Sequence, residues 1–120
     1  IFKPNSIMQM LFDNFRSPGG PAITGADVRL GDTDQCVYVL SRQAGEGGDR
    51  RAEKGDLYLT DEEREAICFC AAHYEKFVLV INCGSAMDVS FLERVPGINA
   101  LLYICPPIAY LSFYICFLRV

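Results

Sequence analysis

The sequence predicts an α/β fold: a three-layer sandwich with a mostly parallel sheet, of which the chain contains a partial, flavodoxin-like portion. Three short runs of aliphatic and β-branched residues have the length and composition of strands that are buried on both faces. A helical segment lies between each run and the next, and strands that alternate with helices form parallel sheets through right-handed crossovers. The three runs are Cys36–Leu40, Phe77–Ile81 and Ala100–Ile104.

The chain has 120 residues, which is enough for one small domain. Residues 1–33 are expected to form an irregular connecting segment with one short helix near Ser6–Phe15, because the Ser-Pro-Gly-Gly-Pro stretch at residues 17–21 breaks regular structure. Residues 34–105 are expected to hold the partial sandwich, and residues 106–120 an apolar tail. Because three strands make an incomplete sheet, we expect the chain to be part of a larger domain.

The segment between the first two strands predicts a well-capped helix. Thr60 and Glu63 have the spacing of a capping box, and the acidic first turn suits the positive end of the helix dipole. We expect Lys76 to close the last turn. Apolar residues recur at helical spacing along one face. They are Ile67, Cys70, Ala71 and Tyr74.

The region after the second strand predicts a short helix and contains one ambiguous carboxylate. The helix is expected at Ser90–Val95, where Ser90 and Glu93 repeat the capping-box spacing and a Pro-Gly pair follows. Asp88 either caps this helix or lines a cleft beyond the second strand, and we favour capping. The single histidine, His73, is interpreted as a packed or half-exposed side chain beside Phe69 and not as a metal ligand.

Composition excludes several classes of function. The net charge of −4 and the absence of a basic stripe argue against a nucleic-acid partner. None of the six cysteines forms a C-x-x-C pair, so we expect no metal site and no cofactor. We interpret the cysteines as reduced thiols that behave as small hydrophobes, which favours a cytoplasmic location and leaves secretion open.

The loop Ser41–Arg50 is the candidate functional segment. It follows the first strand directly, and ligands bind beyond the carboxyl ends of strands in open parallel sheets. Glycines flank Glu46 on both sides, and glycine permits a tight turn and close approach by another surface. The glycine pattern matches no phosphate-binding loop, and an acidic side chain would repel phosphate. On composition alone, a solvated surface turn is the favoured interpretation of this loop.

Residues Ala26 to Cys105 resemble the second, α/β-sandwich domain of glycoside hydrolase family 3, the β-glucosidase type. Five segments carry the resemblance, in order and with compatible spacing. They are VYVLSR (37–42), GEG with DR (45–50), KGDLYLT (54–60), VLVIN (78–82) and GINALL (97–102). After Cys105 the resemblance ends, because the Gln-Pro-Gly-x-Glu-Gly-Gly segment of the family is replaced by Pro106-Pro107 and an apolar stretch.

The resemblance implies a retaining glycosidase that acts on a β-glucoside or a related oligosaccharide. In this family an N-terminal barrel domain, missing from this chain, supplies an aspartate nucleophile, and a loop of the second domain supplies the general acid/base. Glu46 matches that acid/base, with Gly45 and Gly47 beside it, and Asp49 and Arg50 match the pair expected to brace the loop. This chain alone is therefore expected to be inactive.

Retention requires two carboxyl groups about 5–5.5 Å apart, one of them protonated at the start. A partner domain would have to bury Glu46 and raise its pKa, whereas Arg42 and Arg50 are expected to lower it. Asp49 is too close along the chain to be the second carboxylate of a sugar site. As an alternative function, the chain is a non-catalytic α/β module whose loop mediates domain contacts.

The uncharged stretch Ala100–Leu118 is long enough to raise the question of a membrane span. The Pro106-Pro107 pair and the strand-like first half argue against a continuous helix. We therefore favour an exposed apolar end of a gene fragment over a membrane helix.

Overall fold

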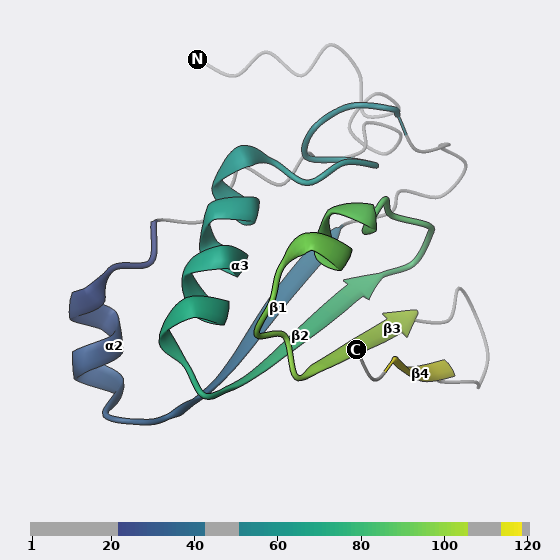
Figure 1. Cartoon of the computed structure of the whole chain (residues 1–120). Coiled ribbons are helices and arrows are strands. Elements are labelled where there is room, and N and C mark those ends of the chain that lie inside the picture. Colours follow the sequence, from purple (N-terminus) through teal and green to yellow (C-terminus); the bar gives the residue numbers. More distant parts are fainter. Residues whose placement is uncertain (1–21, 43–50, 106–113, 119–120) are drawn as a thin grey trace, which may run out of the picture.

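The computed structural model describes residues 22–42, 51–105 and 114–118. It contains one four-stranded sheet in the order β1-β2-β3-β4 (Figure 1). The strands are β1 (Gln35–Arg42), β2 (Lys76–Cys83), β3 (Ala100–Cys105) and β4 (Tyr114–Leu118). β1 pairs with β2 and β2 with β3 in parallel, whereas β4 pairs antiparallel with β3 at the edge. The predicted α/β fold with a mostly parallel sheet is confirmed, and each of the three predicted strands is present.

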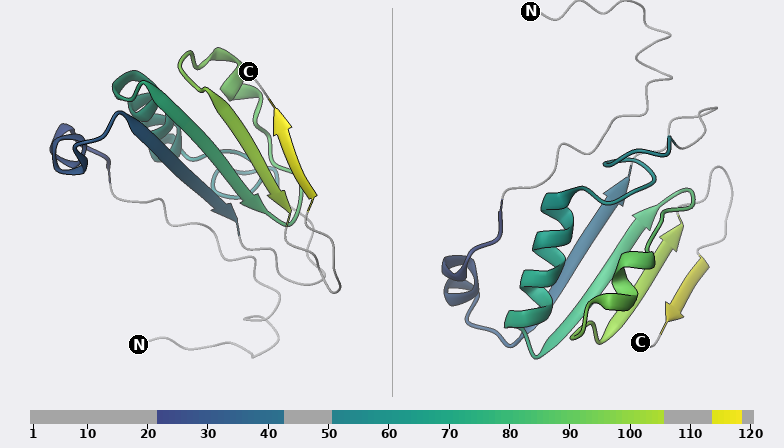
Figure 2. Two further views of the ribbon diagram at one scale, coloured as in Figure 1. Left: turned by 90° about the horizontal axis from the view of Figure 1, so that it is seen from below. Right: turned by 45° about the horizontal axis from the view of Figure 1, so that its top comes forward.

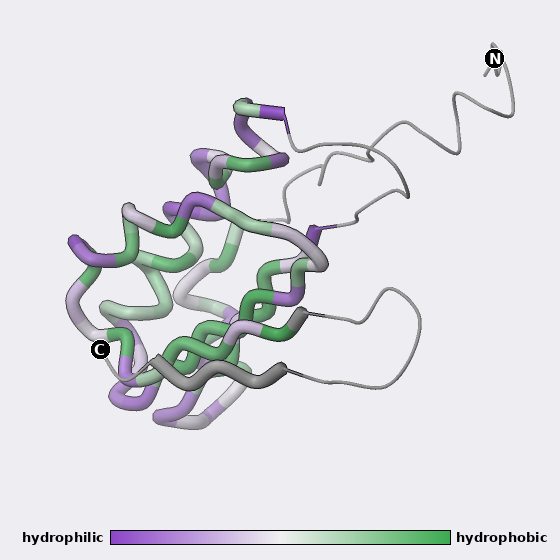
Figure 3. The backbone as a smooth tube through the Cα atoms, turned by 90° about the vertical axis from the view of Figure 1, so that its right-hand side faces the viewer, coloured by the Kyte–Doolittle hydropathy of each residue, from purple (hydrophilic) through white to green (hydrophobic). Residues whose placement is uncertain are grey.

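The core lies between the sheet and helix α3 (Asp61–His73). Phe77, Leu79 and Ile81 alternate along β2 and are fully buried toward the helix, as the two-residue period of a strand requires. Ile67 and Cys70 of α3 belong to the same cluster, so the predicted apolar face of the helix is confirmed. Figure 3 shows the hydrophobic stretches gathered in the strands.

Helix α3 begins as predicted. Thr60 is its N-cap: the Thr60 hydroxyl accepts from the amide of Glu63 at 3.1 Å, and the Glu63 carboxylate accepts from the amide of Thr60 at 2.9 Å. The prediction that Lys76 closes the helix is wrong, because α3 ends at His73 and Lys76 is the first residue of β2. Pairing of the Lys76 amide with the carbonyl of Asp34, at 3.0 Å, starts the strand there instead.

The connection from β2 to β3 contains a short 3₁₀ helix, η1 (Ser90–Arg94), where a helix was predicted. The expected capping box between Ser90 and Glu93 is not formed, because Val89 occupies the N-cap position. The carboxylate of Asp88 accepts from the amide of Ser90 at 2.9 Å, so Asp88 binds the first amide of η1 from the position before the N-cap. These bonds from Ser90 lower the pKa of Asp88 below its usual value.

Two segments predicted to lack regular structure contain elements. Helix α2 (Gly25–Gly31) lies within residues 1–33. At its start, the Asp27 carboxylate accepts from the amide of Thr24 at 2.7 Å. The helix ends at Asp32, which has a φ of 44°. The remaining predicted helix, Ser6–Phe15, lies outside the described residues. Strand β4 lies within the apolar tail, residues 106–120. Residues 114–118 form a strand because their backbone N–H and C=O groups pair with those of β3.

Helices cover one face of the sheet. Figure 2 shows α3 and η1 on the same side, in front of the strands in its right-hand view. On the opposite face, Val37 and Val39 of β1 are 64% and 55% exposed. Their partners in register on β2 are less exposed: Val78 is partly buried and Val80 is buried. An apolar strip on a parallel sheet is therefore open to solvent beside β1, where the sequence predicted burial on both faces.

Candidate functional site

The predicted functional residues follow the carboxyl end of β1. β1 ends at Arg42, and the described chain resumes at Arg51. The predicted acid/base and its neighbours lie between these two points, outside the described residues. They are Gly45, Glu46, Gly47, Asp49 and Arg50. The structure therefore describes both ends of the segment 43–50, and these ends are held by a cluster of buried polar groups.

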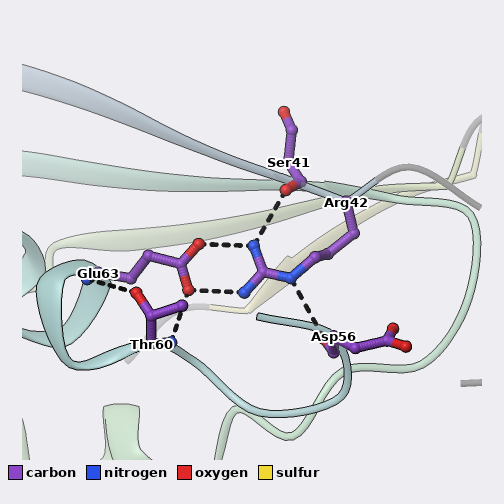
Figure 4. A network of polar contacts seen from close by, with 5 residues as sticks. All are labelled: Ser41, Arg42, Asp56, Thr60 and Glu63. Carbon is purple, nitrogen blue, oxygen red and sulfur yellow. Dashed lines mark hydrogen bonds and ion pairs between the residues drawn. The ribbon is translucent and has the colours of Figure 1, made fainter. Parts of the chain in front are cut away.

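Arg42 lies at the centre of that cluster (Figure 4). Its guanidinium forms a two-pronged ion pair with Glu63 of α3: Nη1 to Oε1 and Nη2 to Oε2 are both 2.6 Å. Only 1% of the Arg42 side chain and 4% of the Glu63 side chain are exposed. Paired nitrogens that face both carboxylate oxygens are the strongest ion-pair geometry available to proteins.

The other donors of Arg42 bind backbone carbonyls. Nη1 donates to the carbonyl of Ser41 at 3.1 Å, and Nε donates to the carbonyl of Asp56 at 3.2 Å. The expectation that Arg42 lowers the pKa of Glu46 stays a prediction, because Glu46 lies outside the described residues. The positive charge of Arg42 is matched by the adjacent negative charge of Glu63, because the fold turns the guanidinium inward toward α3.

Asp56 connects the two ends of the segment. Its carbonyl accepts from Arg42, the last residue before residues 43–50, and its carboxylate Oδ2 accepts from the amide of Arg51, the first residue after them, at 3.0 Å. Asp56 itself is 3% exposed. It sits in a tight turn in which Gly55 adopts a φ of 86°, a conformation that glycine adopts at little cost. We call Arg42, Asp56 and Glu63 the loop-base cluster.

The carboxyl ends of the neighbouring strands lie beside this cluster in the sheet, because Arg42 pairs in register with Cys83. The thiol of Cys83 donates to the carbonyl of Ser85 at 3.0 Å, and the hydroxyl of Tyr103 on β3 donates to the same carbonyl. These bonds fix the turn that follows β2. A parallel sheet thus brings three separate segments of the chain to one edge, as a binding site requires.

A surface pocket of about 450 Å³ opens beside η1. Asp88 lines it and also binds the first amide of η1 through its carboxylate. Its other lining residues are Met87, Val89, Ser90, Leu92, Glu93 and Leu101. The amide of Asp88 donates to the carbonyl of Leu57 at 2.9 Å, which ties this pocket to the turn that carries Asp56.

His73 packs against Phe69, and the cysteines whose side chains the structure describes differ in burial. The His73 ring stacks on Phe69 with centroids 3.9 Å apart, as predicted. Cys70 and Cys83 are buried thiols, and burial, with a contribution from nearby Cys36, raises the pKa of Cys70 to about 12. Cys68 is exposed and Cys36 is partly buried.

Within residues 22–42, 51–105 and 114–118, no three His, Cys, Asp or Glu side chains are grouped as metal ligands would be. In the same part of the chain no helix is long and apolar enough to cross a membrane. Strands β3 and β4 instead occupy the two ends of the uncharged stretch Ala100–Leu118.

The loop-base cluster was not predicted as a unit. Glu63 was identified from its capping-box position, and that role is confirmed, but its partner Arg42 stands 21 residues away. Asp56 was identified only as part of the family segment at residues 54–60. The available signal was Glu63, three residues after its cap Thr60 at the start of a helix, together with Arg42 at the end of the first strand.

Comparison with known proteins found no protein-family model that matches the chain. A β-glucosidase of Ruminococcus albus is 26% identical over 72 residues, which are 60% of this chain and 8% of that protein. β-Glucosidase A of Butyrivibrio fibrisolvens is 22% identical over 78 residues, 65% of this chain and 9% of that protein. The chain thus spans less than a tenth of the length of these relatives.

A solved structure shares the fold. The β-glucosidase from Paenibacillus barengoltzii superimposes with a TM-score of 0.63 at 20% sequence identity, over 69% of this chain and 10% of that one. At this identity the likeness establishes a common fold for the matched part.

Proposed function

We propose that this chain is part of a glycoside hydrolase of the β-glucosidase type and contributes the general acid/base of the reaction, Glu46. The observation that carries the proposal is the position of residues 43–50: they follow the carboxyl end of a parallel strand in a fold shared with a solved β-glucosidase. The two relatives named β-glucosidase support the same reaction class. In this proposal the chain corresponds to the α/β-sandwich domain of glycoside hydrolase family 3.

The proposed reaction is hydrolysis with retained configuration at the anomeric carbon. Glu46 donates a proton to the glycosidic oxygen while a carboxylate of a separate barrel domain attacks the sugar. The same group then takes a proton from the water that releases the sugar. The sandwich domain supplies one half of this pair, so the chain alone is expected not to hydrolyse β-glucosides.

Glu46 must be protonated at the start, so its pKa must be raised when the two domains meet. Pairing of Arg42 with Glu63 supports this step, because a compensated arginine exerts little field on a nearby carboxyl group. Asp49 and Arg50 are proposed to brace the loop, with Gly45 and Gly47 giving the backbone the freedom to bring the carboxyl group against the sugar.

The test uses a joined enzyme, in which this chain replaces the matching segment of the Ruminococcus albus β-glucosidase. It should release nitrophenol from nitrophenyl β-glucoside, whereas the 120-residue chain alone should not. Glu46→Gln should lower turnover of an alkyl β-glucoside by about 10²–10⁴-fold, the usual contribution of general acid–base catalysis. Glu62→Gln, an exposed helix position, is the matched control and should retain activity.

Glu46→Ala allows the role to be distinguished from binding. With a dinitrophenyl glucoside, which needs no acid, added azide should restore turnover and yield β-glucosyl azide, because the small anion replaces the base-activated water. Turnover by the chain alone that Glu46→Gln abolishes would contradict the proposed division of labour.

The alternative is a non-catalytic module whose loop mediates domain contacts, and the open strip at Val37 and Val39 is the observation that favours it. In that case Glu46→Gln would leave kcat of the joined enzyme unchanged and would weaken domain association instead. Sedimentation of the separate domains measures that association directly.

A further inference from the structure

The segment 43–50 is held at both ends by one buried residue. Asp56 accepts from the Nε of Arg42 through its carbonyl and from the amide of Arg51 through its carboxylate, at 3.2 and 3.0 Å. Arg42 and Arg51 are the residues on either side of the segment. Two bonds from different atoms of Asp56 therefore fix where the chain leaves β1 and where it returns.

The cluster has its own anchor in the core. Arg42 is bound to Glu63 by two short bonds, and Glu63 is fixed in turn by the amide of Thr60 at the start of α3. Both charged side chains are almost fully buried. If either one moved away, the other charge would remain buried without a partner, which is unfavourable. The ends of the segment are thereby tied to β1 and α3, the elements that build the core.

We propose that Asp56, Arg42 and Glu63 are positioning residues: the loop-base cluster fixes Arg42 and Arg51, the exit and return points of the segment that contains Glu46. The catalytic part of this inference rests on the proposed function, whereas the positioning part does not. A misplacement of about 1 Å can lower a catalysed rate 10²-fold, so a loop that carries a reacting group needs such support.

Exchange of backbone amide hydrogens in the 120-residue chain tests the positioning. Asp56→Ala removes the bond to Arg51 and retains the carbonyl bond to Arg42. Amides in residues 43–50 should exchange about tenfold faster, the effect of losing one buried hydrogen bond, while those of β2 remain within twofold. Asp56→Asn keeps a side-chain oxygen that can accept from Arg51, so it should restore the original rates.

Asp88→Ala is the matched control. It removes the same kind of bond, a carboxylate that accepts from a backbone amide at 2.9 Å, at η1 instead of at the loop. In Asp88→Ala, the backbone amides of residues 90–94 should exchange faster, and those of residues 43–50 should exchange at unchanged rates. Equal acceleration of all segments in Asp56→Ala would mean that the residue supports the whole fold, and unchanged exchange in 43–50 would overturn the proposal. The proposal would also be overturned if these amides, in the unaltered chain, exchanged as fast as those of an unstructured peptide.

The joined enzyme separates the two proposals. Asp56→Ala should lower kcat about 10²-fold with KM within twofold, and Asp56→Asn should recover most of it. Azide should rescue Glu46→Ala but not Asp56→Ala, because the carboxyl group is still present in the second variant. If Glu46→Gln leaves turnover intact while Asp56→Ala accelerates exchange in 43–50, the proposed function fails and the positioning stands. The opposite pair of results rejects the positioning alone.

Discussion

Arg42 and Glu63 are charged residues that lie inside the protein. Burial of a charge is unfavourable unless a partner of opposite sign and enough hydrogen bonds replace the lost water. Both conditions hold here: each guanidinium nitrogen has an acceptor, and both oxygens of Glu63 have a donor. The pair is therefore tolerated as a unit, and the loss of one member leaves the other charge unmatched.

Glu63→Ala should reduce the free energy of unfolding by about 3–5 kcal/mol, because Arg42 would remain buried without its partner. Urea denaturation followed by circular dichroism measures the change. Asp61→Ala is the control: Asp61 pairs with Lys54 at 2.5 Å on the exposed surface, and no measurable change is expected.

The double variant Arg42→Met with Glu63→Met isolates the cause. With both charges replaced by flexible apolar side chains, much of the lost stability should return, since no unmatched charge remains. A double variant as unstable as Glu63→Ala would indicate that the capping bonds of Glu63, and not its charge, dominate.

At the scale of elements, the turn between η1 and β3 holds the sheet together at its amino-terminal edge. The carboxamide of Asn99 accepts from the amide of Phe77 at 2.7 Å, and the amide of Asn99 donates to the carbonyl of Phe77 at 2.9 Å. Just before it, Gly97 has a φ of 95°, and a Cβ there would lie 2.5 Å from the carbonyl oxygen of Ala71 in α3. The turn fits only because this position has no side chain.

Gly97→Ala is therefore expected to destabilise the chain by about 1–3 kcal/mol from backbone strain, with further loss from the contact with α3. Thermal and urea denaturation measure this. Gly31→Ala, where the added Cβ would lie 3.7 Å from Thr33 with no positive φ, should change stability by less than about 1 kcal/mol. Similar losses at both positions would count against the packing argument.

Considered as a whole, the molecule has a core on one face of the sheet and an open apolar strip on the other. Val37 and Val39 form that strip, whereas Val80, the partner of Val39 on β2, is buried. Exposed apolar strips of this kind associate with other apolar surfaces, whether a further part of the same domain or a second copy. The strip is consistent with the expectation of an incomplete domain.

We expect the isolated 120-residue chain to self-associate in solution. Replacement of Val37 and Val39 by threonine keeps the β-branched shape and adds a hydroxyl, so it should shift the sedimentation velocity distribution toward monomer. Replacing Thr33, outside the strip, by valine serves as the control and should leave the distribution unchanged. A sharp, cooperative melt from a monomeric unaltered chain would contradict the idea of an unfinished fold.

Local sequence patterns predicted most elements of the fold. The apolar runs and the Thr60–Glu63 box depend on residues within a few positions of one another, so they can be read without the tertiary structure. The misassigned boundaries have physical causes of longer range. Backbone pairing with Asp34 assigns Lys76 to a strand, and pairing with β3 gives Tyr114–Leu118 a strand conformation. The assignment of Glu46 remains a prediction.

The sequence by itself determined the α/β class, the parallel strands and the place of the loop Ser41–Arg50 after the first strand, because these follow from periodicity and chain order. Only the tertiary structure decided that Arg42 turns inward to Glu63 and that Asp56 joins both ends of the segment. It also decided which face of the sheet stays open. Contacts between distant residues depend on how helices and strands pack, which no local pattern encodes.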